Sequence, residues 1–131
     1  MIEISLAKKE KDRSEALQLA REIFPSSAPS FSSNHIILIA KFKKYPIGFL
    51  HIIPKKDKLI LQGLGVKNSV RSRGVATMLL AHAVDLFSQT NLPVFLKVKP
   101  LNSVVLLYET FGFFLKQYGQ DVCIMKWGQN S

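Results

Sequence analysis

The stretch GLGVKNSVRSRGVATMLL, residues 63–80, joins two apolar segments through a short basic turn. The first segment ends at Val66, and residues 67–73 carry three positive charges and no negative one. Gly74 then opens residues 74–89, where apolar side chains recur at helical spacing and no Lys or Arg occurs. The first amides of a helix have no partner inside it, and with the helix dipole they attract anions. The sequence therefore predicts an anion site where the turn meets this helix.

The segments flanking the turn predict a strand-helix-strand unit. Residues 59–66 and 94–98 are short, apolar and rich in strand-forming residues, and Asn91 and Pro93 end the helix between them. A helical crossover within one sheet forces its two strands to lie parallel.

The remaining segments predict a mixed α/β fold with the element order β-α-β-β-β-α-β-α-β-β. The Ser- and Pro-rich residues 25–34 predict a loop, which either contributes to binding or only connects two elements. A chain of 131 residues predicts a single domain, residues 1–131. The other expected elements are a strand at 1–7, a helix at 12–24, a hairpin of 35–42 and 47–53 around KKYP, a helix at 102–111 ended by Gly112, and strands at 113–117 and 122–127.

Cysteine and histidine usage predicts neither a disulfide nor a metal site. Cys123 is the one cysteine, and His35, His51 and His82 lack the spacing of metal ligands. The first residues lack the apolar core of a signal peptide, and no apolar stretch is long enough to span a bilayer. We therefore expect a cytoplasmic protein without a membrane partner.

The net charge of +9 favours an anionic partner, which includes nucleic acid, an anionic membrane surface and a polyphosphate cofactor. A basic surface that serves solubility is the alternative. Because the helix at 74–89 is basic only at its tip, one compact anion fits better than a nucleic-acid backbone. No Walker A string occurs, and the G-x-G-x-x-G pattern begun by Gly63 and Gly65 has Asn68 at its third position.

The basic turn and its flanks resemble motif A of the Gcn5-related N-acetyltransferase (GNAT) superfamily, whose core is [RQ]-x-x-G-x-[GA]. Val66, Arg71, Gly74, Ala76 and Leu79 stand at the matching positions.

A second block, NSVVLLYETFGF at residues 102–113, is similar to the N…LYExxGF segment of the same family. The resemblance implies a mainly antiparallel sheet with helices on both faces. It also implies a parallel βαβ pair whose strands diverge past Val66 to hold acetyl-CoA.

The resemblance implies acetyl-CoA as co-substrate and direct attack by a primary amine, without a covalent enzyme intermediate. The backbone at Leu64 and Val66 would pair with the pantetheine arm, and the N–H near Leu64 would polarise the thioester carbonyl. Tyr108 would protonate the leaving thiolate, although a core aromatic is the alternative. Asn102 would touch the pantetheine or cap its helix. The resemblance also implies that the pyrophosphate would be bound by Arg71, Ser72, Arg73, Gly74, Val75 and Ala76.

The chain departs from the family pattern at four positions, one of which is Val105 in place of the commoner Ala. Ser72 replaces a glycine, and Asn102 lies one residue closer to Tyr108 than is typical. Many relatives carry a glutamate base on the strand before the turn, where this chain offers Gln62. The proton of the amine would then pass to water, to His51 or to a group not yet placed, and a packed histidine is the alternative for His51.

The acceptor amine is expected between residues 25–34, the hairpins and the turn YGQD at 118–121. Glu109 and Asp121 are the carboxylates that could attract a cationic amine. The basic surface disfavours strongly cationic acceptors and favours an amino acid, an acidic peptide or an amine on an anionic carrier. A catalytically weak module that binds CoA or nucleic acid is the alternative function. Relatives often pair, so a homodimer is one expected assembly.

Overall fold

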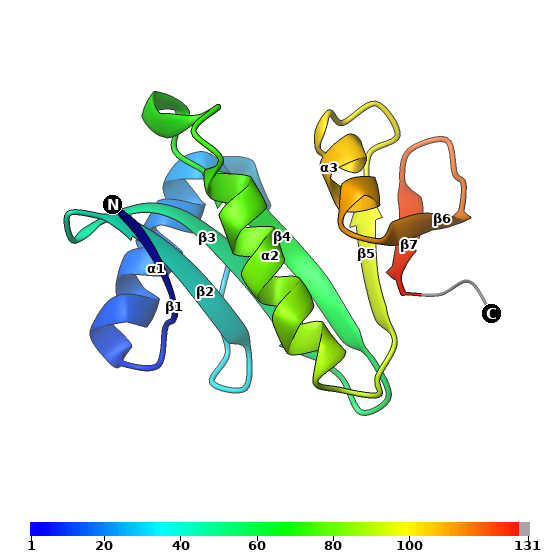
Figure 1. Cartoon of the computed structure of the whole chain (residues 1–131), viewed down its shortest axis with the longest axis horizontal. Helices are drawn as coiled ribbons and strands as arrows, with labels where there is room; N and C mark the ends of the chain where they lie inside the picture. Colours follow the sequence, from blue (N-terminus) through cyan, green and yellow to red (C-terminus); the bar gives the residue numbers. More distant parts are fainter. Residues whose placement is uncertain (129–131) are drawn as a thin grey trace.

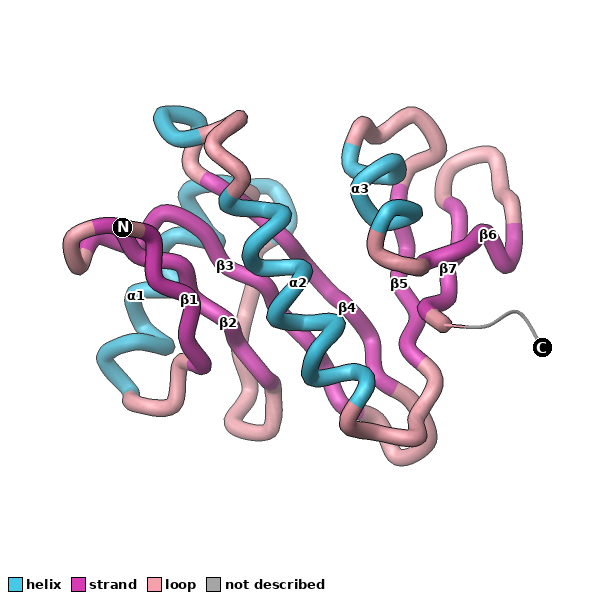
Figure 2. The backbone as a smooth tube through the Cα atoms, in the orientation of Figure 1, coloured by secondary structure: helices cyan, strands magenta, loops and turns pink. Residues whose placement is uncertain are grey.

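One mixed sheet organises the protein (Figure 1, Figure 2). The computed structural model describes residues 1–128, and its seven strands follow the order β1-β2-β3-β4-β5-β7-β6. Every neighbouring pair is antiparallel except β4 and β5, which confirms the predicted parallel pair. The strands are β1 Ile2–Leu6, β2 Ile36–Phe42, β3 Tyr45–Pro54, β4 Leu59–Val66, β5 Val94–Val98, β6 Phe113–Gln117 and β7 Cys123–Trp127; the helices are α1 Glu10–Ile23, α2 Val75–Ser88 and α3 Val104–Thr110.

Helix α1 covers one face of the N-terminal half of the sheet and lies behind β2 and β3 in Figure 1. Its small residues Ala16 and Ala20 let it approach Ile37, Ile39 and Phe49 closely.

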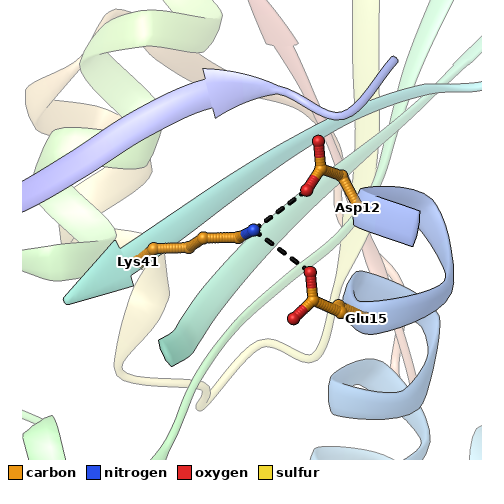
Figure 3. Close-up of polar contacts among 3 residues, drawn as sticks. All are labelled: Asp12, Glu15 and Lys41. Atoms are coloured by element: carbon orange, nitrogen blue, oxygen red, sulfur yellow. Dashed lines mark hydrogen bonds and ion pairs between the residues drawn. The ribbon is translucent and has the colours of Figure 1, made fainter. Parts of the chain in front are cut away.

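A polar contact also attaches α1 to β2. The Lys41 ammonium donates to Asp12 at 2.9 Å and to Glu15 at 3.1 Å, as Figure 3 shows. Both carboxylates lie one turn apart on the side of α1 that faces the sheet, so the lysine fixes the rotation of the helix about its axis.

Helices α2 and α3 pack on the opposite face. Strand β3 alternates accordingly, because Phe49 packs under α1 whereas Leu50 and Ile52 belong to the core beneath α2. Helix α2 buries Val75, Leu79, Leu80, Ala83 and Phe87 in that core. Helices therefore lie on both faces, as predicted.

Strands β4 and β5 separate much earlier than predicted. Only Leu59 and Ile60 of β4 pair with β5, whereas we expected divergence past Val66. The register of β3 with β4 passes from Ile52↔Leu61 to His51↔Gly63, so Gln62 is an extra residue without a partner on β3. Such a bulge bends its strand and increases the twist, which carries β4 away from β5.

Several predicted element boundaries also differ from the structure; helix α1, for example, begins at Glu10, two residues before its predicted start. The β2–β3 turn consists of Lys43 and Lys44, both at positive φ, and not of the four residues KKYP. Two residues with positive φ match the twist of a tight hairpin. Helix α3 begins at Val104, two residues later than predicted, and the Val104 N–H donates to Oδ1 of Asn102, which lies just before the helix.

Candidate active site

The basic turn connects β4 to α2 and is fixed to the sheet at its start. The Lys67 N–H donates to the Ile47 carbonyl at 2.9 Å, and a short 3₁₀ helix follows at Asn68–Val70. Ser72 and Gly74 then adopt left-handed conformations, with φ of 68° and 80°. Ser72 thus takes a conformation that favours glycine, the residue of the family pattern at this position. A Cβ atom added at Gly74 would meet nothing within 4 Å, so a ligand can approach the backbone there.

The backbone amides at the start of α2 point to no protein acceptor. The first helical hydrogen bond runs from the Met78 N–H to the Gly74 carbonyl at 3.0 Å. Among residues 1–128, the amides of residues 72–77 donate to no protein group. The side chains of Arg71 and Arg73 are exposed and form no ion pair with the described residues. Amides, helix dipole and guanidinium groups together make this corner a site for a compact anion.

One edge of β4 is open beyond the splay. Leu64 and Val66 pair with Leu50 and Gly48 of β3, and their side chains pack into the core under α2. On the other edge, residues 61–66 have no strand partner within the described part of the chain. An extended ligand can therefore pair with the backbone of β4 along this edge.

Tyr108 is buried in the same core as Leu64 and Val66. Its ring lies 5.5 Å from that of Phe113, and burial raises the pKa of its phenol to about 12. Within residues 1–128, every fully buried side-chain oxygen has a hydrogen-bond partner. The Tyr108 hydroxyl has no partner among these residues, so it is not fully buried and must reach solvent. The phenol is therefore protonated at neutral pH and free to donate.

Asn102 uses one side-chain atom locally. Its Oδ1 accepts from the Val104 N–H at 3.0 Å, which caps α3, and its own N–H donates to the Lys99 carbonyl. The side chain is exposed, and its Nδ2 remains available to a ligand.

His51 lies on the other face of the sheet, under the loop of residues 25–34. Its Nε2 is 2.8 Å from Nδ1 of His35, and the Ser32 N–H approaches the same Nδ1 at 3.2 Å. Because that Nδ1 accepts the backbone hydrogen, it is unprotonated, and His51 donates through Nε2. Burial, then the proximity of His35 and Arg13, lowers the pKa of His51 to about 4.

Sequence reasoning missed the His35–His51 contact and the Arg13 hydrogen bonds that hold the His35 backbone in place. Arg13 donates to the His35 carbonyl at 3.0 Å and to the Ser32 carbonyl at 2.7 Å. Counting from the two-residue turn alone would pair His51 with Ile36 and place His35 on the other face. The bulge between Ala40 and Lys41 shifts the pairing to Ile37↔His51, which puts His35 and His51 on the same face. The four-residue turn that we predicted obscured this register.

Several other features lie apart from the basic turn. A hollow of about 600 Å³ beside the start of α1 is lined by Arg13, Phe31 and His35 among others, and by no residue of the turn. The described residues bring together no group of three His, Cys, Asp or Glu side chains suited to a metal. No helix among residues 1–128 is long and apolar enough to cross a membrane.

The family model described as "Acetyltransferase (GNAT) family" matches residues 4–113. A search of curated protein sequences gave no match.

Solved structures of two N-acetyltransferases and one N-acyltransferase share the fold at low sequence identity. The PaiA N-acetyltransferase of Thermoplasma acidophilum, in complex with coenzyme A, is 19% identical with a TM-score of 0.74, over 97% of this chain and 99% of that one. Naa50 of Arabidopsis thaliana, in complex with the bisubstrate analogue CoA-Ac-MVNAL, is 19% identical with a TM-score of 0.79, over 96% and 99%. An acyl-CoA N-acyltransferase of Pseudomonas aeruginosa is 14% identical with a TM-score of 0.80, over 98% and 100%.

Proposed function

Because the chain belongs to the acetyltransferase (GNAT) family, we propose that it transfers the acetyl group of acetyl-CoA to a primary amine. The amine attacks the thioester directly in a ternary complex. The neighbour crystallised with coenzyme A supports this choice of co-substrate. We also propose that residues 1–131 act as one acetyltransferase domain, although residues 129–131 lie outside the described part of the chain.

The observation that carries the proposal is the cluster of amides without protein acceptors where the 14-residue helix α2 begins. A pyrophosphate there would accept hydrogen bonds from several N–H groups and neutralise Arg71 and Arg73. The open space over Gly74 accommodates it. We assign this contact to Arg71, Ser72, Arg73, Gly74, Val75 and Ala76.

The open edge of β4 supports the reaction site. We propose that the backbone of Val66 and Leu64 pairs with the pantetheine arm, and that the Leu64 N–H stabilises the developing oxyanion. The amine nitrogen forms a bond to the carbonyl carbon while the carbon–sulfur bond breaks. Tyr108 donates its phenolic proton to the departing sulfur. Its raised pKa keeps that proton in place at neutral pH, and it also makes the phenol a weaker acid than the thiol that forms. The Nδ2 of Asn102 is proposed to bind the pantetheine.

Strand β4 carries no carboxylate that could act as the general base. Gln62 cannot accept a proton from an ammonium group, so we propose that the proton passes to water or to Nδ1 of His51. The hydrogen bond from His51 Nε2 to His35 leaves Nδ1 as the basic nitrogen. His51 pairs with Gly63, next to Leu64, although its side chain lies on the face away from Tyr108.

We propose a peptide or small-molecule amine as the acceptor and a homodimer as one assembly. The peptide portion of the bisubstrate analogue bound to Naa50 supports the first choice. The absence of a carboxylate at Gln62 favours one second function, a catalytically weak module that binds CoA or nucleic acid.

Thermal shift and steady-state kinetics test the proposal. Acetyl-CoA at 100 times its Kd should stabilise the protein by about 2.7 kcal/mol through mass action. Arg71→Ala should weaken acetyl-CoA binding roughly tenfold at low salt, while Lys56→Ala, in the β3–β4 turn at the opposite end of β4, should bind as wild type does.

Tyr108→Phe should lower kcat roughly tenfold or more with little change in acetyl-CoA affinity, because the phenol acts only as the thiolate leaves. Release of free thiol from acetyl-CoA with an amine panel measures the rate. Wild-type affinity in Arg71→Ala would refute the pyrophosphate assignment, and binding without thiol release would favour the non-catalytic module.

A further inference from the structure

The C-terminal half of the sheet has one face without a helix. Leu96, Phe113 and Met125 point into the core under α2 and α3, whereas Phe95, Phe114 and Ile124 belong to neither apolar core. In Figure 1, α3 lies in front of the upper part of β5, and α1 lies behind the strands at the other end of the sheet. Within residues 1–128, no helix covers this second face, which we name the open face.

The open face combines aromatic rings with lysines in a defined register. Phe95 of β5 pairs with Lys126 of β7, which pairs with Phe114 of β6. In the next row Lys97 pairs with Ile124. The Lys126 ammonium lies 5.9 Å from the centre of the Phe95 ring.

The charge of these strands has one sign. Strands β5, β6 and β7, with the sequences VFLKV, FFLKQ and CIMKW, contain three lysines and no carboxylate. Among residues 1–128, neither Lys97 nor Lys126 forms an ion pair. Such a surface attracts anionic groups and repels cationic ones.

We propose that the open face binds an acidic segment of a polypeptide acceptor, which rests on the proposed acetyl transfer. Lys126 pairs with Phe95, which lies two residues before Lys97 on β5, so the two lysines are diagonal neighbours on adjacent strands. Strand geometry places their Cα atoms about 8 Å apart. Carboxylates at alternate positions of an extended peptide lie about 7 Å apart. One peptide with acidic residues at alternate positions can therefore reach both lysines.

The location of the open face connects it to the reaction site. Ile60↔Phe95 is the last paired row before β4 leaves β5. A peptide that lies across Phe95 reaches the start of the gap between these strands. About four further residues would carry its amine to Leu64, where we propose that the thioester lies.

Two other occupants fit less well. Single-stranded nucleic acid needs aromatic faces on which bases stack, but the Phe95 ring is capped by Lys126, and Phe95 and Phe114 are half-buried. A second copy of the chain would place lysines against lysines across a two-fold axis.

Matched peptides test the assignment. Two peptides with a free N-terminal amine and a C-terminal fluorophore differ only in carrying Asp or Asn at alternate positions. We expect fluorescence anisotropy at low salt, without acetyl-CoA, to show the Asp peptide binding about tenfold more tightly, and the preference to shrink as salt rises. The value of kcat/KM should show the same preference when acetyl-CoA is added.

Charge variants locate the site. Lys97→Glu/Lys126→Glu should abolish the preference for Asp. Lys97→Met/Lys126→Met, which keeps unbranched side chains at both positions, should remove most of it. Lys43→Glu/Lys44→Glu makes the same charge change at the opposite end of the molecule and should retain it. Melting temperatures confirm that each variant is folded.

Equal binding of the two peptides would overturn the inference, as would an unchanged preference in folded Lys97→Glu/Lys126→Glu. Tighter binding of an oligothymidylate of equal charge would assign the face to nucleic acid instead. A concentration-dependent dimer that Lys97→Glu/Lys126→Glu disrupts, with peptide affinity unchanged, would assign it to a second copy. If no amine at all is acetylated, the proposed function fails, and anisotropy still decides whether the face binds acidic peptides.

Discussion

Gly65→Ala and Gly63→Ala form a matched pair that tests how closely the α1 side packs against β4. A Cβ atom at Gly65 would lie 2.7 Å from Cε1 of Phe49 and 2.8 Å from Cε2 of Phe24. Phe24 is 37% exposed and can rotate away, but Phe49 is 2% exposed and is confined by the core under α1. Overpacking of this kind costs about 2 kcal/mol.

A Cβ atom at Gly63 would lie 3.5 Å from Phe49 and 4.0 Å from His51, which is ordinary van der Waals contact. Both changes remove a glycine from the same strand, so their effects on strand propensity and on the unfolded chain largely cancel in the comparison. We therefore expect Gly63→Ala to stay within about 0.5 kcal/mol of wild type.

Urea denaturation followed by circular dichroism measures both free energies of unfolding, and thermal denaturation should place Gly65→Ala about 5–10 °C below Gly63→Ala. Equal stability of the two variants would show that the Phe24 and Phe49 rings do not close over Gly65. Greater loss in Gly63→Ala would refute the register that places Gly63 beside His51.

Three further perturbations test other parts of the molecule. Ser72→Gly should raise the free energy of unfolding by about 0.5–1 kcal/mol in urea denaturation, because Ser72 has a φ of 68° that glycine adopts without strain; no gain would contradict the left-handed turn. Lys41→Met should lower stability by about 0.5–1 kcal/mol. Because the hydrogen bond from Lys41 lowers the pKa of Asp12 below 3.8, the deficit should be present at neutral pH and fade as pH falls below that value. The pKa of His51 is lowered from 6.5 to about 4 in the folded protein, so between these pH values the unfolded chain binds a proton that the folded chain does not. The free energy of unfolding should therefore fall as pH drops from 6.5 towards 4, by up to about 1.4 kcal/mol per pH unit. A His51→Asn variant measured by urea denaturation should lose this part of the pH dependence.

Local patterns predicted most elements and the parallel pair. Each strand and helix was recognisable from the spacing of its own apolar residues, as in the 14 residues of α2. The boundaries failed where strand pairing decides them, as at the β2–β3 turn, where pairing from Phe42↔Tyr45 onward leaves only Lys43 and Lys44 as the turn.

Long-range pairing decided what the patterns could not. Strand β7 lies between β5 and β6, although β6 precedes it in the chain, and this order creates the row of Phe95, Lys126 and Phe114. The contact of His35 with His51 likewise depends on the β2–β3 register.

The sequence by itself determined that a basic turn with small residues leads from a strand into an apolar helix, because those properties belong to consecutive residues. Only the tertiary structure decided where the strands part, since the bulge at Gln62 exists only relative to β3. It also decided which lysines share a face, because side chains on different strands become neighbours only once the register between the strands is set.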